Sequence, residues 1–460
     1  MENWSGKRVL ILGAARQGLA LARYLSEQGA FVTLNDKRTE DQLLEAKEKL
    51  ADLSINWVFD GHPVSLLEQA DLLCLSGAIP DTLPIVQEAK HRGLPLSNDT
   101  EIFLQNVHCP VIGITGSAGK TTTTTLVGRM VEAGKSENQT IWVGGNIGQP
   151  LLNDLKSMKP NDLVILELSS FQLELTTLSP YVGAILNITP NHLDRHGTME
   201  AYTAAKLRLL DFQTADDIAV LNHDDPVTRA AADKVHGKLI TFGFTRHPDF
   251  ETQVFERGSD IILQKGNDET VIMPVDAIEL RGRHNVGNVI SACAIAAAAD
   301  ISPAAMLESV KGFTGVPHRL EWVRNVNSVN WYNDSICTAP ERTIAAINSF
   351  DEPIVLLLGG RDKNLSWEKL AQLVHQRVDH VVLFGEAAPI VNQALTTDGT
   401  YQKPLTLQIA KHLQEAVRLA AQVAEPGSVV LLSPGGTSFD EFYDFEERGR
   451  YFRKWVGELR

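Results

Sequence analysis

The chain has 460 residues, of which 43% are hydrophobic and 22% are charged, values that exclude a disordered chain and allow about three globular domains. Its 42 basic and 57 acidic side chains give a net charge of −15, which disfavours non-specific binding to nucleic acid or to an anionic membrane. The sequence shows no signal-peptide pattern and no run of 18 apolar residues, so we expect no membrane insertion and a cytoplasmic location.

Short apolar runs alternate with Gly-containing turns and amphipathic stretches of helical length along most of the chain. This alternation is typical of βα units around a parallel sheet, so the predicted fold class is α/β. One early helix is expected at 19–26. The apolar runs predict strands at 7–12, 31–34, 71–75, 111–114, 164–166, 182–186, 354–358, 381–384 and 429–432.

Polar turns near residue 97 and near residue 315 predict three domains. The expected domains are a Rossmann-like domain at 1–97, a central parallel-sheet domain with a P-loop at 98–315 and a second Rossmann-like domain at 316–460. The stretch 237–280 alternates more strongly and is expected to form a small β subregion inside the middle domain.

The four cysteines are widely spaced, and no Cys-x-x-Cys pair occurs among them. This spacing suggests neither a zinc knuckle nor a disulfide framework. We therefore expect free, buried thiols at Cys74, Cys109, Cys293 and Cys337.

A first glycine loop, residues 13–18, follows a predicted strand and opens a predicted helix, and Asp36 ends the next strand. In this context the helix N-terminus attracts phosphate and the acid meets a sugar or a base. A dinucleotide loop would have glycine at its third position, where this chain has Ala15. Binding of some nucleotide is favoured, NAD or FAD is a minority alternative, and glycines serving only tight packing remain a third reading.

A second glycine loop gives a stronger signal, because Gly116-Ser117-Ala118-Gly119-Lys120-Thr121-Thr122 lies between a strand and a helix expected from Thr123. Backbone N–H groups of such a loop cradle phosphate, the lysine neutralises phosphate oxygens, and the threonine hydroxyl can bind Mg²⁺. The loop is the shorter Gly-x-x-Gly-Lys-Thr form. It predicts ATP and magnesium.

Two further groups of polar residues follow apolar strands of the middle domain. Glu167 stands at the carboxyl end of its strand, where it could hold a metal ion facing Thr121. The segment 191–197 contains His192, Asp194 and His196, whose spacing allows a zinc reading, although zinc would need further ligands. A histidine near magnesium or a phosphorylated intermediate, and a purely structural loop, are the other interpretations.

Several motifs occur in the order in which they occur in the Mur ligases, the ATP-dependent amino-acid-adding enzymes of peptidoglycan precursor synthesis. The chain resembles this family over nearly its whole length, and most resembles the members that add D-glutamate to UDP-N-acetylmuramoyl-L-alanine. The motifs that carry the resemblance are Thr-Gly-Ser-Ala-Gly-Lys-Thr-Thr at 115–122, Gly-Asn-Ile-Gly at 145–148, Glu-Leu-Ser-Ser-Phe-Gln-Leu at 167–173, Asn-His-Leu-Asp-Arg-His-Gly at 191–197, Tyr-Thr-Ala-Ala-Lys-Leu-Arg at 202–208, Gly-Arg-His-Asn-Val-Gly-Asn at 282–288, Pro-His-Arg-Leu-Glu at 317–321, Asn-Asp-Ser at 333–335, Gly-Gly-Arg-Asp-Lys at 359–363 and the tail from 432 to 449.

The resemblance implies a role for each matching position. Only the resemblance makes Lys206 a candidate site residue, because by residue type alone it would be a solvated lysine on a helix. It matches the family's carbamylated lysine, a ligand for a second Mg²⁺. The implied catalytic residues are Lys120, Glu167, His192 and Lys206, with metal held by Thr121, Glu167, His192 and the Lys206 carbamate. ATP would be bound by residues 116–122 together with Asn285, Asn288, Arg319 and Asp334. The UDP substrate would meet Ala15, Arg16, Gln17, Asp36, Lys37, Ser76 and Asn146. Glutamate would meet Thr338, Lys363, Ser438 and Phe445.

Two departures from the family pattern stand out. After Asp334-Ser335 the family commonly has lysine, whereas this chain has Ile336-Cys337-Thr338, so a cation near the amino-acid end of the cleft is missing. Arg361 and Lys363 could supply that charge. The expected Ser-Pro-Gly of the first domain reads Ser76-Gly77-Ala78, a smaller change.

Several other functions would use some of the same motifs. A folylpolyglutamate-synthase-like ligase would begin near the phosphate loop, whereas about 100 residues precede it here. Other Mur ligases add different amino acids, and L-glutamate is the alternative to D-glutamate. A nicotinamide-dependent oxidoreductase would leave the second glycine loop unexplained, and a non-catalytic nucleotide-gated protein would not need Glu167, His192 and Lys206 together. We expect a monomer whose third domain closes over the substrates.

Overall fold

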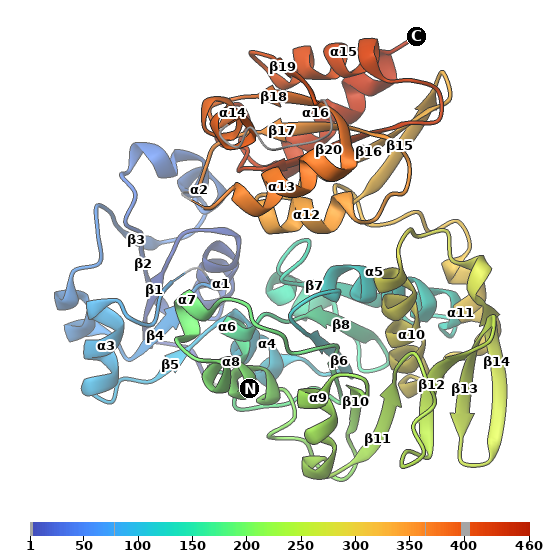
Figure 1. Cartoon of the computed structure of the whole chain (residues 1–460). Helices are drawn as coiled ribbons and strands as arrows, with labels where there is room; N and C mark the ends of the chain where they lie inside the picture. Colours follow the sequence, from blue (N-terminus) through green and yellow to red (C-terminus); the bar gives the residue numbers. More distant parts are fainter. Residues whose placement is uncertain (1–2, 78, 364, 397–404) are drawn as a thin grey trace. The chain divides into compact units, whose positions relative to one another are not determined.

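The structure is a computed structural model that describes residues 3–77, 79–363, 365–396 and 405–460. The chain folds into two compact units (Figure 1). The first holds the residues up to Ile278 together with His284–Lys311, and the second holds Glu279–Arg283 and Gly312–Arg460. The α/β class that the sequence predicts is confirmed. Ala78 lies outside the described residues.

The first unit begins with a five-stranded parallel sheet. Its elements are β1 (Arg8–Leu12), α1 (Arg16–Glu27), β2 (Phe31–Asn35), α2 (Leu44–Lys49), β3 (Ile55–Val58), β4 (Leu72–Leu75), α3 (Pro84–His91) and β5 (Leu96–Ser97). The strand order is β3-β2-β1-β4-β5. The predicted helix at 19–26 is about one turn longer, because α1 already starts at Arg16, within the first glycine loop.

Two glycines allow β1 to turn tightly into α1. Gly13 has φ +94°, a left-handed conformation that favours glycine. A Cβ atom on Gly18 would lie 1.8 Å from the carbonyl oxygen of Gly13. The first glycine loop thus has a packing reason for both glycines, whatever it binds.

A nine-stranded sheet forms the rest of the first unit. Its elements are α4 (Asp99–Asn106), β6 (Val111–Thr115), α5 (Lys120–Gly134), β7 (Ile141–Gly145), β8 (Leu163–Glu167), α6 (Ser170–Leu173), β9 (Val182–Ile185), α7 (Leu193–His196), α8 (Met199–Leu207), β10 (Ile218–Asn222), α9 (Pro226–Ala230), β11 (Lys238–Phe242), β12 (Thr252–Arg257), β13 (Asp260–Lys265), β14 (Asp268–Pro274), α10 (Arg283–Ala298) and α11 (Pro303–Val310). The strand order is β14-β13-β12-β11-β10-β9-β6-β8-β7.

The predicted β subregion at 237–280 is confirmed as strands, but it is not a separate sheet. Strand β11 pairs with β10 in parallel, and β12, β13 and β14 extend the same sheet, the last three as antiparallel neighbours. The helix expected from Thr123 begins three residues earlier, at Lys120. Gly119, with φ +82°, makes the turn into it, so the helix N-terminus lies directly at the phosphate loop.

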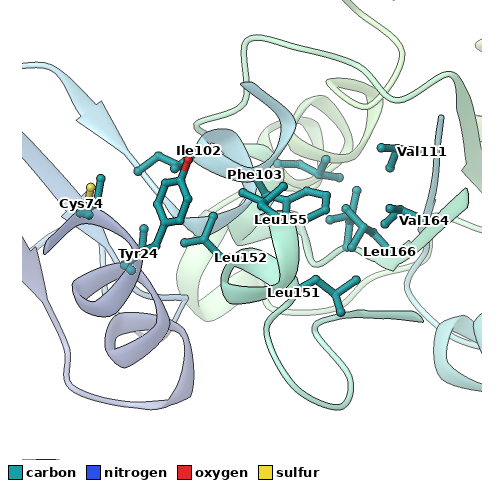
Figure 2. Close-up of a cluster of buried hydrophobic side chains, with 14 of the residues drawn as sticks. Tyr24, Cys74, Ile102, Phe103, Val111, Leu151, Leu152, Leu155, Val164 and Leu166 are labelled. Carbon is teal, nitrogen blue, oxygen red and sulfur yellow. The ribbon is translucent and has the colours of Figure 1, made fainter. Parts of the chain in front are cut away.

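One apolar cluster joins the two sheets of the first unit (Figure 2). It runs from Tyr24 and Cys74, in the region of the first sheet, through Ile102 and Phe103 of α4 to Val164 of β8, all buried. The 3-10 helix η3 (Leu151–Ser157) adds Leu151, Leu152 and Leu155 to it. The residues before 97 and the nine-stranded sheet therefore share a continuous core.

The second unit is built on a six-stranded sheet. Its elements are β15 (Glu321–Val326), β16 (Val329–Asn333), α12 (Pro340–Ile347), β17 (Ile354–Gly359), α13 (Glu368–Arg377), β18 (Val378–Phe384), α14 (Ala388–Thr396), β19 (Thr406–Ile409), α15 (Leu413–Val423), β20 (Val429–Gly435) and α16 (Phe445–Glu458). The order is β15-β16-β20-β17-β18-β19, and only the β15–β16 pair is antiparallel. Buried aliphatic side chains cover both faces of its central strands, as a parallel sheet requires.

The cysteine prediction is confirmed, because Cys74, Cys109, Cys293 and Cys337 are all free and buried. Across the parts that the structure describes, no helix has the length and apolarity needed to cross a lipid bilayer.

Two glycine substitutions are expected to act in opposite directions. Gly18→Ala would force a Cβ atom into the Gly13 carbonyl and should destabilise the protein by about 1–3 kcal/mol. Gly457→Ala lies in α16 with no atom within 4 Å of the new Cβ, and should stabilise it by about 0.5–1 kcal/mol because alanine is the better helix former. Urea unfolding followed by circular dichroism measures both. An unchanged midpoint for Gly18→Ala would contradict the described contact.

Candidate active site

Polar residues gather where four neighbouring parallel strands of the nine-stranded sheet end. In the order β9-β6-β8-β7, these strands lead into Asn187, Gly116, Glu167 and Asn146. The carboxyl ends of parallel strands share one edge, and ligands of open α/β sheets bind there. Gly116, Glu167 and Asn146, three of the residues predicted from the sequence, thus lie at one edge.

The phosphate loop, residues 116–119, is packed too tightly for side chains at its two glycines. A Cβ atom on Gly116 would lie 2.9 Å from Cβ of Leu186, and one on Gly119 would lie 2.4 Å from Oδ1 of Asn288. Asn288, on α10, also donates from Nδ2 to Oδ1 of Asn285 at 2.9 Å. Asn288 therefore lies beside the loop, and Asn285, the second asparagine predicted to bind nucleotide, is hydrogen-bonded to it.

Two lysines point at the same backbone carbonyl. The Nζ atoms of Lys120 and Lys206 donate to the carbonyl oxygen of Gly116 at 2.9 and 3.0 Å. Lys206 also donates to Oγ1 of Thr115 at 3.3 Å, and its ammonium lies 4.9 Å from the centre of the Tyr202 ring. The Gly116 carbonyl oxygen thus accepts a hydrogen bond from both lysine side chains.

Lys206 is almost fully buried, with 1% of its surface exposed. The solvated position that its residue type suggests is therefore wrong. Burial and the nearby Lys120 ammonium lower the pKa of Lys206 to about 7, although Glu167 opposes this shift. With this pKa, Lys206 is a neutral amine in a substantial fraction of the molecules at neutral pH. A neutral amine is a nucleophile.

Glu167 offers one oxygen that the described part of the chain leaves without a hydrogen bond. Its Oε1 accepts from Nδ2 of Asn146 at 2.9 Å, whereas Oε2 is buried without a partner. The Asn146 N–H also donates to the Glu167 carbonyl at 2.8 Å. Because leaving a buried carboxylate oxygen unpaired is costly, the arrangement favours a cation at Oε2.

The two histidines of the segment 191–197 have different surroundings. His192 is exposed, with its ring edge-on to Phe171 at 5.3 Å. His196 is buried, with Nδ1 2.9 Å from Oε1 of Glu174 and Nε2 2.9 Å from Oγ of Ser170. The side chain of Asp194 is not among those that the structure describes.

The zinc reading of that segment gains no support. Within the described ranges, no group of three or more His, Cys, Asp or Glu side chains is arranged to hold a metal ion. His196 is instead a structural residue, since its ring also stacks on Phe171 at 5.0 Å.

Asp36 of the first unit is engaged by the chain itself. Its carboxylate accepts from the Ala14 N–H at 2.8 Å and from the Arg38 guanidinium at 2.8 and 2.9 Å. Burial alone would raise the pKa of Asp36, but these hydrogen bonds and the Arg38 charge outweigh burial and hold it at about 2. The acid is therefore ionised, and it fixes the first glycine loop.

Three of the other residues predicted to meet the UDP substrate, Ala15, Arg16 and Gln17, belong to the same loop. Ala15 precedes α1, and Gln17 accepts from the Gly77 N–H at 3.1 Å. Arg16 donates to the carbonyl of Gly148, two residues after Asn146, at 3.4 Å. The members of this group are Ala15, Arg16, Gln17, Asp36, the exposed Lys37 and the buried Ser76.

In the second unit, Asp334 is buried at the end of β16. It accepts from the Leu320 N–H at 3.2 Å and from Oγ of Ser433 at 2.8 Å. Burial raises the pKa of Asp334 to about 6, against the opposing effects of these hydrogen bonds and of Arg319 and Arg342. Arg319 therefore lies within electrostatic reach of Asp334.

The two side chains expected to supply the charge that position 336 lacks have different partners. Arg361 is paired with Glu386, at 2.7 and 3.0 Å. Lys363 instead donates from Nζ to Oγ1 of Thr338 at 3.3 Å, and burial together with Arg342 lowers its pKa. Lys363 and Thr338 are thus neighbours, as a shared amino-acid site would need.

Arg448 is a residue of this region that sequence reasoning missed. It is fully buried and donates to Oγ and O of Ser335, at 3.0 and 2.8 Å, and to the Gly436 carbonyl at 3.1 Å. Burial lowers its pKa to about 10. Oγ of Ser335 in turn donates to the carbonyl of Phe445 at 2.8 Å, so Arg448 ties the loop of Asp334 to the segment of Ser438 and Phe445.

Family models match three segments of the chain. They are described as Mur ligase MurD-like, N-terminal domain (residues 7–97), Mur ligase middle domain (114–296) and Mur ligase, glutamate ligase domain (318–436). The prediction of three domains is confirmed, whereas the boundaries at 97 and 315 stay predictions.

Curated relatives match over nearly their whole length. One from Symbiobacterium thermophilum is 40% identical over 98% of both chains. One from Pelotomaculum thermopropionicum is 37% identical over 100% of this chain and 99% of the relative, and one from Koribacter versatilis is 38% identical over 99% and 98%. All three are named UDP-N-acetylmuramoylalanine--D-glutamate ligase.

Solved structures share the fold at low sequence identity. The UDP-N-acetylmuramate-alanine ligase MurC from Thermotoga maritima matches with a TM-score of 0.60 and 19% identity, over 98% of this chain and 99% of that one. A pseudomurein peptide ligase type C from Methanothermus fervidus matches with a TM-score of 0.56 and 18% identity, over 99% and 100%. With the family models and the full-length relatives, these findings place the chain in the Mur ligase family.

Proposed function

We propose that the protein is an ATP-dependent amide ligase that joins D-glutamate to UDP-N-acetylmuramoyl-L-alanine and releases ADP and phosphate. One observation carries the proposal: the Gly116 carbonyl holds two lysines at a phosphate loop whose neighbouring strand presents the unpaired Oε2 of Glu167. The names of the full-length relatives support the choice of substrates. The reaction belongs to peptidoglycan precursor synthesis.

The chemistry starts from two unreactive groups, a carboxylate and an ammonium. Transfer of the γ-phosphoryl group of ATP to the alanyl carboxylate gives an acyl phosphate, which has a good leaving group. The amine of glutamate, after losing a proton, attacks the acyl carbon, and phosphate leaves as the amide forms. The protein's part is mostly electrostatic, and Lys120 would balance charge on the transferring phosphoryl group.

The residues at the strand ends fit a magnesium requirement. The fit rests on the unpaired, buried Oε2 of Glu167 and on Thr121 in the first turn of α5, because carboxylate and hydroxyl oxygens are ligands that Mg²⁺ accepts. His192 and Lys206 would complete a second site, so two ions are proposed. Magnesium, when bound, neutralises phosphate charge during transfer.

Lys206 would act as a carbamate. Reaction of its neutral amine with CO₂ forms a carbamate anion and releases one proton, which converts a cation into an oxygen ligand. Burial and the pKa of about 7 support this role, since an ordinary lysine is protonated at neutral pH. Conversion to an anion would also remove the repulsion between Lys206 and Lys120.

The remaining residues would bind the three substrates. Residues 116–122 would hold the ATP phosphates, Asn285 and Asn288 would face adenine, and Arg319 and Asp334 would also bind ATP. The UDP substrate would meet Ala15, Arg16, Gln17, Asp36, Lys37, Ser76 and Asn146. Glutamate would meet Thr338, Lys363, Ser438 and Phe445. We place the reaction in the cytoplasm and expect a monomer.

The choice between D- and L-glutamate is tested by phosphate release from ATP and Mg²⁺ with UDP-N-acetylmuramoyl-L-alanine. We expect release with D-glutamate, and background release with L-glutamate or with no amino acid. This outcome would mean that Lys363 beside Thr338 suffices without a lysine at position 336. Release with L-glutamate only would keep the chemistry and change the specificity. No release with any amino acid would overturn the proposed function.

Lys120→Ala removes the cation proposed to meet the transferring phosphoryl group. We expect turnover to fall by roughly 10²-fold or more, since electrostatic groups at a developing charge have effects of this size. Steady-state phosphate release at saturating substrates measures the change. A rate within twofold of the wild type would show that Lys120 is not catalytic.

Lys206→Ala should lose activity and regain part of it with added formate or acetate, because a small carboxylate can replace the carbamate oxygens. Lys120→Ala is the control, since it lacks a cation and should not respond to these acids. Activity of Lys206→Ala near the wild-type level would refute the role.

The same role predicts a pH dependence. Below the Lys206 pKa of about 7, protons compete with CO₂ for the amine, so the carbamate forms more weakly and its occupancy depends more on the CO₂ concentration. Removal of dissolved CO₂ should therefore reduce wild-type activity more at pH 6 than at pH 8. Equal sensitivity at both pH values would argue against the carbamate.

A further inference from the structure

The chain beside the phosphate loop continues the sheet beyond the end of its strands. The Leu186 N–H donates to the Thr115 carbonyl at 2.9 Å, and the Ser117 N–H donates to the Asn187 carbonyl at 3.0 Å. These bonds prolong the parallel pairing of β6 and β9. The first half of the loop is therefore attached to its neighbour as though it were still a strand.

The side chain of Asn187 adds a second attachment at the next residue of the loop. Its Oδ1 accepts from the Ala118 N–H at 2.9 Å, and its Nδ2 donates to the Ala118 carbonyl at 3.1 Å. One amide group thus satisfies both backbone groups of a single loop residue. This contact needs an amide, because one of its atoms must accept a hydrogen bond while the other donates one.

A hydroxyl pairing completes the attachment. Oγ of Ser117 accepts from the Thr189 N–H at 3.0 Å and lies 2.9 Å from the Tyr202 hydroxyl. Ser117 and Ala118 are therefore bound by Asn187 and Thr189 of the segment 187–189. Among the hydrogen bonds of the described residues, Asn187 is the only residue of that segment whose side chain bonds to both the N–H and the carbonyl of one loop residue.

These contacts decide which donors remain for a phosphate. The N–H groups of Ser117 and Ala118 are directed at the neighbouring segment. A phosphate is then left with the first N–H groups of α5, which have no intrahelical acceptor, and with the Lys120 ammonium. The common loop has four residues between its glycines and can wrap a phosphate by itself, whereas this loop has two.

We propose that Asn187 is a positioning residue, which holds the short phosphate loop in its nucleotide-accepting shape by clamping the backbone of Ala118. It is additional to the residues assigned above. The inference rests on the proposed function in so far as the loop binds ATP. It makes the loop's shape depend on a side chain outside the loop.

Asn187→Ala removes both hydrogen bonds and lets the loop leave its bound shape. We expect nucleotide to bind roughly tenfold more weakly or worse, the size expected from losing two hydrogen bonds. Asn187→Asp keeps an acceptor for the Ala118 N–H but sets a second oxygen against the Ala118 carbonyl, so it should not restore binding. The KM for ATP should rise in both variants while the KM for UDP-N-acetylmuramoyl-L-alanine stays unchanged.

Asn222 offers a matched control. It ends β10, is half-buried, and makes two backbone hydrogen bonds, from Nδ2 to the Leu186 carbonyl and to Oδ1 from the Asp224 N–H, each 2.9 Å long. Among the hydrogen bonds of the described residues, neither of those of the Asn222 side chain reaches the phosphate loop. Asn222→Ala should therefore resemble Asn187→Ala in melting temperature but bind nucleotide like the wild type.

The experiment is equilibrium titration of the full chain with a fluorescent ADP analogue and Mg²⁺, alongside the steady-state assay. A tenfold or larger loss confined to the Asn187 variants supports the clamp. Wild-type affinity in Asn187→Ala, restoration by aspartate, or an equal loss in Asn222→Ala overturns it. If Asn187→Ala does not fold, Asn187→Ser, which is too short to reach both groups, takes its place.

The binding titration separates this inference from the proposed function. A wild type that binds nucleotide but releases no phosphate with any amino acid would end the ligase proposal, while the clamp would still be judged by the variants. A wild type that binds no nucleotide would overturn the clamp as well.

Discussion

The convergence of two lysine side chains on the Gly116 carbonyl is the constraint on which the active-site edge depends. A buried carbonyl can accept two donors, but two full positive charges side by side in a nearly dry environment are unfavourable. The site resolves the conflict by leaving Lys206 easily deprotonated while Lys120, in the first turn of α5, is less enclosed. The phosphate loop, helix α5 and helix α8 are thereby linked through one atom.

This convergence is possible because the parallel strands β6, β8 and β9 end in register. Glu167 pairs with Ile114, and Thr115 pairs with Ile185, so the loops that follow begin at the same level of the sheet. Each loop then presents one polar group to the next, as with the Asn146 amide on Glu167. The apolar interior of the sheet therefore fixes the polar edge, and a shift of one residue in any of these strands would misplace its site residue.

The sequence predicts those elements whose pattern is contained in a short stretch of neighbouring residues. Apolar runs bounded by glycine turns identified the central strands, and the spacing from Gly116 to Thr121 identified the phosphate loop. It could not find the burial of Lys206 or Arg448, because a single cation on an amphipathic helix looks the same whether it faces water or a gap in the core. The contacts of Asn187 were equally hidden, since they depend on pairing between strands about 70 residues apart in sequence.

The apolar cluster that Figure 2 shows has a consequence for how this chain could have been assembled in evolution. Tyr24 and Cys74 pack into the same interior as Phe103, Leu152 and Val164, so the first 97 residues are not an interchangeable module. A recombination event that replaced these residues alone would leave α4 and η3 packed against side chains that do not fit them. An exchange of gene segments would be tolerated more readily if the exchanged segment also encoded α4 and η3. Substitutions in the first 97 residues should therefore be correlated with substitutions in α4 and η3.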